Sequence, residues 1–355
     1  TAQWSGWVFA GPFFISFFLT PVWGSLGDKY GRKIISIRAI FGLAIAQVLV
    51  GLSQNVTQLF MARLLQGALS GFIPSAMALV AANTPKEKTS YALGILQTGT
   101  AAGTVLGPLI GGFLADLVGY RNVFFLVSGL LTLTGMFFII FVKEYNKVDK
   151  NERKFSWIEN WKFIFQNKKL KKIGLLIALT ALGFTLIRPI FVLYLETFNI
   201  TSEYFATITG AVYGVMGIFT AFSSAIWGKR AAKSGYKKNL IYAASITAGM
   251  YIIHFFIYDV WLLIIVRSIL GFGFGGLLPL LFSFLNENVP FNRKSGVLAV
   301  GSSFQILGNI AGPTSGGMIS GLFGLRIPFL VSGLIFLIFS SIMFTFLKET
   351  NQKTI

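Results

Sequence analysis

The 355-residue chain has no cysteine and a single histidine, His254. These absences exclude a disulfide framework, thiol chemistry and a metal site built from cysteines or several histidines. Acidic residues are scarce as well, 12 against 30 Lys and Arg, and charged residues make up only 12% of the chain. No paired carboxylates and no Ser/His/Asp set stand out in the sequence. It therefore disfavours an enzyme, and it predicts no cofactor and no metal.

Apolar residues dominate what is present. Hydrophobic residues account for 54% of the chain and the mean hydropathy is +0.72, which is too apolar for a surface in water. The apolar runs are continuous rather than alternating, so they predict an all-α integral membrane protein and not a transmembrane barrel. We place eleven membrane-spanning helices at 4–27, 33–53, 57–83, 91–115, 122–142, 172–198, 204–227, 239–257, 260–286, 296–320 and 326–347.

The net charge of +18 follows the loops between these spans. Of the 30 Lys and Arg residues, 24 fall in alternate loops, and only Arg121 and Arg326 fall in the other set. The remaining four lie within apolar spans: Arg38, Arg63, Arg188 and Arg267. The positive-inside rule places the basic loops in the cytoplasm. The basicity therefore indicates topology in an inner (plasma) membrane and not a nucleic-acid partner.

Two parts of the chain repeat each other at an offset of 204 or 205 residues. The hexapeptide 125–130 recurs without change at 329–334, and Pro74, Pro85 and Pro108 recur as Pro279, Pro290 and Pro313. The repeat predicts an N-terminal half at 1–142 and a C-terminal half at 172–355. The charged segment 143–171 is the linker. Its apolar residues share one helical face, which indicates either a helix lying in the membrane interface or a plain amphipathic connector: Trp157, Ile158, Trp161, Ile164 and Phe165.

The first helix of the second half, 172–198, has no partner in this sequence, because subtracting the offset gives negative residue numbers. The sequence also begins with Thr1 and has no basic leader. We therefore expect the intact protein to have twelve helices, six in each half, with one helix before residue 1 and both termini in the cytoplasm.

A glycine-spaced charged loop carries the most specific pattern, Gly24-x-Leu26-x-Asp28-x-x-Gly31-Arg32-Lys33. It resembles the loop signature of the major facilitator superfamily at every position. The resemblance implies that fold, with two six-helix halves. It also implies that the loop acts as a latch stabilising the outward-facing state, with gating residues Gly24, Asp28, Gly31, Arg32 and Lys33. The simpler interpretation is a basic loop that only sets topology.

A second pattern places small residues at every fourth position and continues through Gly-Pro: Gly99, Gly103, Gly107, Pro108, Gly111 and Gly112. This spacing predicts one closely packed helix face and a bend at Pro108. The Gly-Pro-x-x-Gly-Gly ending resembles the antiporter motif of drug exporters in the same superfamily. A second copy at 308–317 lowers its diagnostic weight, because it can record the duplication.

The resemblance covers the whole sequence and is closest to the bacterial twelve-helix drug:proton antiporters. It implies a monomeric carrier that exports small amphipathic molecules in exchange for protons, by rocking of its halves in the lipid bilayer. Export of an endogenous metabolite or siderophore, or solute uptake, remains open. A passive channel is disfavoured, since a pore has no use for latch loops.

The resemblance implies a role in proton coupling for Arg63, and the positions of the acidic residues add two further candidates. Arg63 is the first candidate for proton coupling, followed by Glu196, with Arg188 two turns below it on the same predicted helix, and by Asp116. None of the 12 acidic residues lies at the centre of a predicted span. His254 is expected to be a satisfied polar residue. In that architecture the spans 57–83, 172–198 and 260–286 line a central cavity, whose candidate residues are Gln66, Gln97, Arg188, Tyr194, Phe304, Gln305 and Asn309.

Overall fold

The computed structural model describes residues 2–144, 157–198, 203–290 and 293–351, and in these ranges the chain is helical without a strand. The helices are α1 (Ala2–Tyr30), α2 (Arg32–Leu52), α3 (Val56–Leu69), α4 (Phe72–Asn83), α5 (Lys86–Val118), α6 (Tyr120–Phe141), α7 (Trp157–Gln166), α8 (Lys168–Thr185), α9 (Phe191–Glu196), α10 (Phe205–Ser234), α11 (Tyr236–His254), α12 (Val260–Phe274), α13 (Leu277–Glu287), α14 (Lys294–Phe323) and α15 (Ile327–Asn351). The prediction of an all-α fold is confirmed.

Each predicted span coincides with one helix or with two consecutive helices. Three spans are interrupted: 57–83 divides into α3 and α4, 172–198 into α8 and α9, and 260–286 into α12 and α13. The prediction that Arg188 and Glu196 share one continuous helix is therefore wrong. Arg188 lies in the turn between α8 and α9, beside Pro189, which has no backbone N–H to continue a helix.

The chain divides into two compact units. The first unit contains Val8–Arg153 and Glu203–Gly210, and the second contains Thr1–Trp7, Lys154–Ser202 and Ala211–Ile355. Most of α1 and the first turns of α10 thus belong to the first unit together with α2 to α6. The linker assigned to 143–171 remains a prediction, because residues 145–156 lie outside the described ranges.

In the first unit α2 packs against α6 and α3. Ala39 and Ala46 of α2 are fully buried, and Gly135 of α6 faces the ring of Phe41. The Ser128 hydroxyl of α6 donates to the carbonyl of Ala44 at 2.8 Å. Small side chains let the backbones approach closely, which is the main source of helix association in a membrane.

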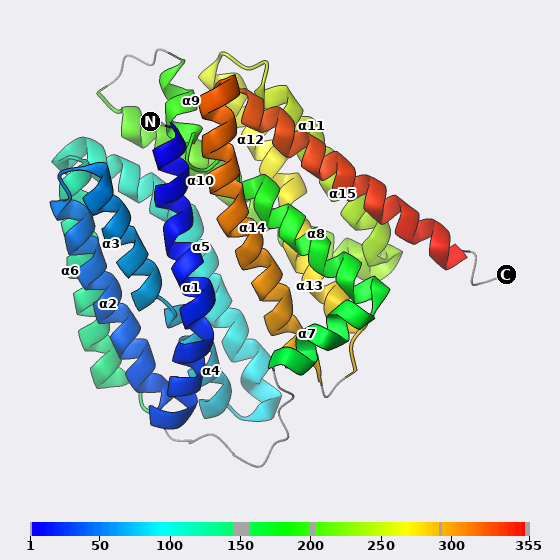
Figure 1. Cartoon of the computed structure of the whole chain (residues 1–355), viewed down its shortest axis with the longest axis horizontal. Coiled ribbons are helices and arrows are strands. Elements are labelled where there is room, and N and C mark those ends of the chain that lie inside the picture. The colour runs from blue at the N-terminus through cyan, green and yellow to red at the C-terminus, as the bar shows by residue number, and fades with distance from the viewer. Residues whose placement is uncertain (1, 145–156, 199–202, 291–292, 352–355) are drawn as a thin grey trace. The chain divides into compact units, whose positions relative to one another are not determined.

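In the second unit α11 lies along α15, and α14 lies along α8 (Figure 1). Ser332, the repeat counterpart of Ser128, donates to the carbonyl of Gly183 at 2.8 Å. The amphipathic helix α7 packs on α14, with the rings of Trp161 and Phe304 5.1 Å apart. Its Ile164 is buried while Ile158 is exposed, so part of the apolar face predicted for the membrane interface is covered by protein.

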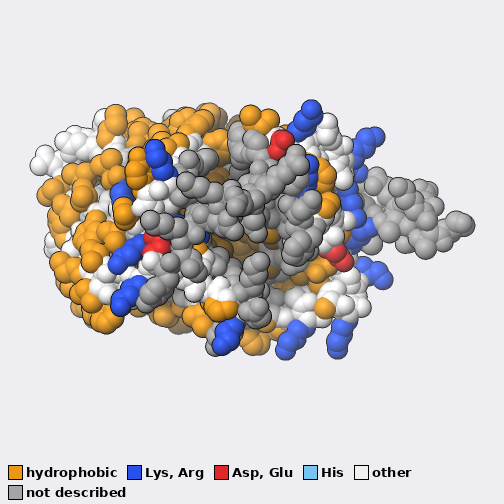
Figure 2. Space-filling view, turned by 90° about the horizontal axis from the view of Figure 1, so that it is seen from below, with side chains coloured by type: hydrophobic (Ala, Val, Ile, Leu, Met, Phe, Trp, Pro, Cys, Tyr) orange, Lys and Arg blue, Asp and Glu red, His pale blue; other side chains and the backbone are white. Residues whose placement is uncertain are grey.

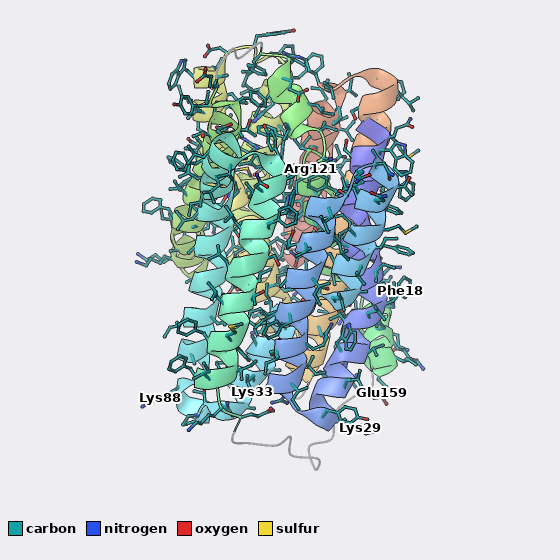
Figure 3. All side chains as sticks on the ribbon, turned by 90° about the vertical axis from the view of Figure 1, so that its left-hand side faces the viewer. Phe18, Lys29, Lys33, Lys88, Arg121 and Glu159 are labelled. Carbon is teal, nitrogen blue, oxygen red and sulfur yellow. The ribbon has the colours of Figure 1, made fainter. Side chains whose placement is uncertain are left out.

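Among the described residues, six helices or helix pairs are long and apolar enough to cross a membrane. On α6 the exposed fraction reaches 66% for Ile140 and 70% for Phe141, as expected for a helix facing lipid. Lys29, Lys33 and Lys88 of the first unit lie at one end and Arg121 lies toward the other (Figure 3). Lys and Arg side chains are scattered over the end-on face shown in Figure 2, with hydrophobic side chains around them.

Candidate transport site

The charged loop joins α1 to α2 through one residue, Gly31. Its φ of 108° lies in the region that favours glycine, because a Cβ would crowd the backbone. A Cβ at Gly31 would also lie 3.1 Å from a carboxylate oxygen of Glu144. The loop can therefore turn within one residue, and it brings the start of α2 against the segment that follows α6.

Glu144 holds this turn. Its two carboxylate oxygens accept the backbone N–H groups of Arg32 at 2.9 Å and of Lys33 at 3.0 Å. A carboxylate at the first N–H groups of a helix satisfies donors that have no partner within the helix and meets the positive end of its dipole. The sequence analysis gave Glu144 no role. The sequence contained one signal for such a role, because the pair Lys143-Glu144 recurs in the repeat as Lys348-Glu349.

The cationic residues of the loop make further contacts within the first unit. The Arg32 guanidinium donates to the carbonyl of Ala78 in α4 at 3.0 Å, and the Lys33 ammonium donates to the carbonyl of Ile139 in α6 at 2.9 Å. The loop thereby ties α2 to α4 and α6. Asp28 lies in the last turn of α1, and its side chain is outside the described residues. Gating by this loop remains a prediction.

The break between α3 and α4 is stabilised by side chains of α1 and α2. The carbonyls of four consecutive residues, 67–70, each accept a hydrogen bond from one of three side chains. The pairs are Ser16 Oγ to Gly67 (3.1 Å), Trp23 Nε1 to Ala68 (2.9 Å), Arg38 Nη1 to Leu69 (3.0 Å) and Arg38 Nη2 to Ser70 (3.2 Å). The Arg38 guanidinium also stacks over the Trp23 ring at 3.5 Å. Arg38 therefore stabilises this break through two backbone carbonyls and the Trp23 ring, a role that the sequence analysis did not predict.

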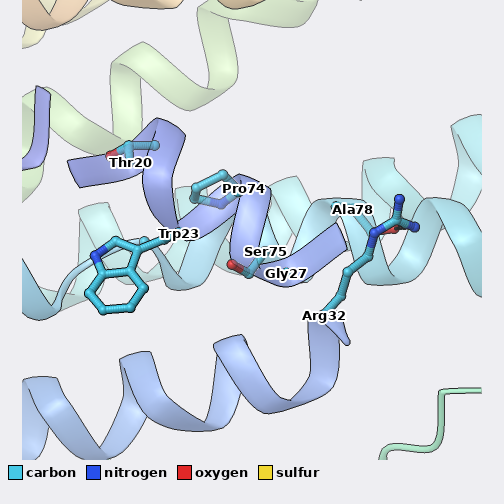
Figure 4. A pocket seen from close by; sticks show the side chains of 9 residues that line it. Thr20, Trp23, Gly27, Arg32, Pro74, Ser75 and Ala78 are labelled. Carbon is cyan, nitrogen blue, oxygen red and sulfur yellow. Dashed lines mark hydrogen bonds between the residues drawn. The ribbon is translucent and has the colours of Figure 1, made fainter. Parts of the chain in front are cut away.

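A pocket lies beside this break, with Trp23 toward one end and Arg32 toward the other (Figure 4). The pocket connects the charged loop at residues 24–33, which we call the latch loop, to the α3–α4 break within the first unit. Its lining residues are Thr20, Trp23, Gly24, Gly27, Arg32, Gly71, Pro74, Ser75 and Ala78.

The α12–α13 break in the second unit is tighter. Gly275 and Gly276 keep right-handed helical dihedrals, and their N–H groups donate to the carbonyls of Gly271 at 3.0 Å and Gly273 at 3.3 Å. Trp227 donates its indole N–H to the carbonyl of Phe272 at 2.7 Å. Most of the carbonyls freed here are thus satisfied by the backbone itself.

Arg63 and Arg267, which are equivalent in the repeat, have different surroundings. Arg63 on α3 is half-buried and donates to the side chain of Gln66, one turn along the same helix, at 2.9 Å. Arg267 on α12 is 3% exposed, with its guanidinium carbon 3.8 Å from the centre of the Phe191 ring. No ion pair to a described carboxylate is found for Arg267.

The two acidic coupling candidates also differ. The Asp116 carboxylate accepts hydrogen bonds from the backbone of Ala206 at 3.1 Å and of Thr207 at 2.6 Å, and so it caps α10 from the end of α5. Glu196 is exposed at the last residue of α9. Asp116 is thus engaged by a helix terminus, whereas Glu196 is open to its surroundings.

The glycine stripe of α5 is not packed as predicted. A Cβ added to Gly103, Gly107 or Gly111 would meet no neighbouring atom within 4 Å, and α5 continues without interruption through Pro108. The predicted close packing of this face is therefore wrong in this structure. Gly112, one position off the stripe, does make the expected approach, to the backbone of Ala206.

The remaining cavity candidates differ in their surroundings. Tyr194 is fully buried and donates its hydroxyl to the carbonyl of His254 at 2.8 Å, so we do not carry it into the proposed substrate site. Phe304 packs between α7 and Gly174 of α8. The side chains of Gln305 and Asn309 are half-buried on α14, and that of Gln97 is outside the described residues.

Comparison with known proteins adds a family profile, curated relatives and a solved structure. The profile of the Major Facilitator Superfamily matches residues 2–258 and again 173–355. The chain is 35% identical over 340 residues to the multidrug resistance protein MdtG of Enterobacter lignolyticus, covering 94% of this chain and 80% of that protein. It is also 35% identical over 335 residues to MdtG of Citrobacter koseri, covering 93% and 81%.

One matching solved structure is a bacterial homologue of the human lysosomal transporter Spinster, crystallised in an inward-facing and unoccupied conformation. The TM-score is 0.79 at 16% identity, and the match covers 97% of this chain and 88% of the other. At that identity the likeness concerns the fold alone.

Proposed function

The chain belongs to the major facilitator superfamily, and we propose that it exports small amphipathic molecules across the membrane in exchange for protons. The relatives named as multidrug resistance proteins support the substrate class. The proposed cycle is alternating access by the two halves.

The observation that carries this proposal is the position of the helix breaks. Among the described helices, the three interrupted spans are the three expected to line the substrate cavity: α3 with α4, α8 with α9, and α12 with α13. Inside a membrane, non-helical backbone is tolerated only where it is buried in protein or lines a cavity. In secondary transporters such discontinuous helices form the substrate and ion sites.

The latch loop supports the alternating part of the proposal. Arg32 reaches a carbonyl of α4, the second segment of a broken helix, while Glu144 fixes the start of α2. A displacement of α4 would therefore stretch or break the hydrogen bond between the Arg32 guanidinium and the carbonyl of Ala78. We propose that release and re-formation of the Arg32 contact accompany the switch between states.

Proton coupling is assigned first to Arg63, as in the sequence analysis. A charged group within a membrane span is expensive and marks a functional site by default. Arg63 has a neutral partner, Gln66, so its charge is not cancelled within the described part of the first unit. Glu196 and Asp116 are the further candidates, and the capped carboxylate of Asp116 makes it the less accessible of the two.

The test is transport into inside-out membrane vesicles energised by respiration, followed with a fluorescent amphipathic dye. We expect accumulation that stops when nigericin collapses the pH gradient. Arg63→Gln should reduce gradient-driven accumulation to the level of vesicles without the protein while leaving dye counterflow intact. The exposed Arg121→Gln, which removes the same charge at one end of the first unit, is the matched control.

Three outcomes would count against parts of the proposal. Accumulation that survives nigericin would reject proton exchange. Loss of dye from energised vesicles, instead of accumulation, would favour an uptake carrier. Wild-type coupling in Arg63→Gln would move the proton step to another residue.

A further inference from the structure

The second unit contains a buried guanidinium that has no described carboxylate as a partner. Arg267 is 3% exposed, and its Nε has no hydrogen-bond partner. Its one hydrogen bond runs from Nη1 to the sulfur of Met216 at 3.7 Å, which is a weak acceptor. The aromatic rings of Phe191 and Tyr213 lie 3.8 and 5.1 Å from its central carbon.

A second arginine is linked to Arg267 through one of these aromatic residues, Tyr213. Arg188 lies in the break between α8 and α9, half-buried, with its guanidinium carbon 4.8 Å from the centre of the Phe184 ring. Tyr213 connects the two arginines: its ring faces Arg267, and its hydroxyl donates to the backbone carbonyl of Arg188 at 3.3 Å.

No described carboxylate of this unit compensates the pair. Asp259 caps α12 through the N–H of Leu262, Glu196 is exposed at the end of α9, and Glu287 is the last residue of α13. Neither Arg188 nor Arg267 forms an ion pair with any described residue. Cation–π contacts offset only part of the desolvation of a buried cation, which stays unfavourable unless it is paired.

We propose that Arg188 and Arg267 bind the anionic group of an amphipathic organic anion, such as a sulfonate or carboxylate, whose apolar part lies against Phe184, Phe191 and Tyr213. The assignment rests on the proposed export function and narrows its substrate class. Arg188 at the helix break is the accessible group, and Arg267 lies deeper. Guanidinium groups suit this role because their planar donors match the oxygens of carboxylates and related anions.

The experiment compares two naphthalene probes of the same aromatic frame. 8-Anilinonaphthalene-1-sulfonate is an anion, and N-phenyl-1-naphthylamine is neutral. The full chain in lipid nanodiscs is titrated with each, against empty nanodiscs. We expect tighter binding of the sulfonate, and a loss of about tenfold or more in its affinity in Arg188→Gln and Arg267→Gln, with the neutral probe little changed. Arg121→Gln, an exposed arginine of the other unit, should bind both probes as the wild type does.

Arg267→Met provides a readout that a purely structural arginine would not give. Replacing an unpaired buried cation by an apolar side chain of similar length is neutral or stabilising. We therefore expect the unfolding temperature without ligand to be unchanged or higher, and the rise on adding the sulfonate to be lost. A lower temperature together with a retained sulfonate response would overturn the proposal, as would equal binding of the two probes by the wild type.

The outcomes separate this proposal from the proposed function. An arginine-dependent preference for the sulfonate without gradient-driven flux in vesicles would keep the anion site and reject proton-coupled export. Gradient-driven flux of both probes that is unaffected by Arg188→Gln and Arg267→Gln would keep export and reject the anion site.

Discussion

Trp23 in the first unit and Trp227 in the second, 204 positions apart, each donate an indole hydrogen bond to the last turn before a helix break. The acceptors are the carbonyls of Ala68 at 2.9 Å and of Phe272 at 2.7 Å. The hydroxyls of Ser16 and Thr220 donate to the carbonyls one residue before these acceptors, those of Gly67 at 3.1 Å and of Gly271 at 3.2 Å. The duplicated unit thus contained a supported break before the two halves diverged.

The halves differ in what completes the break. In the first, Gly71 takes a φ of 110° and Arg38 binds the carbonyls of Leu69 and Ser70. In the second, the position equivalent to Arg38 is Tyr242, which is 52% exposed, and no described cation donates to the carbonyls of the break. The first break is open and depends on a cation of a neighbouring helix, whereas the second is tight and is closed by the backbone N–H groups of Gly275 and Gly276.

This difference bears on the buried arginines. The cation of the first break donates from both Nη groups to protein carbonyls and stacks on an indole ring. In the second unit the backbone needs no such cation, and Arg188 and Arg267 meet aromatic rings and no described anion. Arg38 of the first unit therefore supports the scaffold, whereas Arg188 and Arg267 of the second unit are available for a ligand.

The sharpest test of this contrast is Arg38→Ala against Tyr242→Ala. The first removes both donors to the 69–70 carbonyls and the cation over Trp23, and an unsatisfied buried carbonyl costs roughly 1–3 kcal/mol. We expect a loss of about 3 kcal/mol or more in the free energy of unfolding for Arg38→Ala. For Tyr242→Ala we expect less than about 1 kcal/mol.

Unfolding in mixed micelles with increasing dodecyl sulfate, followed by far-ultraviolet circular dichroism, measures both changes. Equal losses would show that the first break does not depend on its arginine. Arg38→Lys should recover only part of the stability, because an ammonium group does not present two coplanar N–H donors to the two carbonyls.

How much of this could be predicted from sequence depends on the range of the interaction. Hydropathy is local, so all the spans were found, and the family and fold followed from motifs. The breaks were missed because they are stabilised by residues far along the chain: Arg38 was counted only as a cation within an apolar span. The signals were nevertheless present in Pro189 and in the recurrence of Trp23 as Trp227.

The candidate site shows the same limit. The spacing of the glycines identified the stripe on α5 and Gly112 beside it. It did not show which of these glycines packs against a neighbouring helix. It also could not show that Tyr194 is buried with a satisfied hydroxyl. These facts depend on how helices rotate about their axes in the packed protein, which a repeat or motif does not specify.

The two tryptophans allow a second test, with a smaller effect. Trp23→Phe and Trp227→Phe each remove one indole hydrogen bond, a net loss of about 1 kcal/mol. Trp23→Phe should also weaken the stacking with Arg38, so the double-mutant cycle of Trp23→Phe with Arg38→Ala should show a coupling of at least about 0.5 kcal/mol. The cycle of Trp227→Phe with Tyr242→Ala should be additive within that margin. Equal coupling in the two cycles would remove the distinction between the breaks.

The smallest expected difference concerns the turns that precede α2 and α11. Gly31 and Gly235 are equivalent in the repeat and have φ of 108° and 83°. Alanine is strained in either turn, by roughly 1–3 kcal/mol. At Gly31 the new Cβ would also lie 3.1 Å from a Glu144 oxygen, whereas nothing lies within 4 Å at Gly235. Gly31→Ala should therefore be the more destabilising in the same unfolding assay, and Glu144→Ala should remove the excess. If the two glycine variants unfold alike, the carboxylate does not hold the turn, and the loop would be held by the side chains of Arg32 and Lys33.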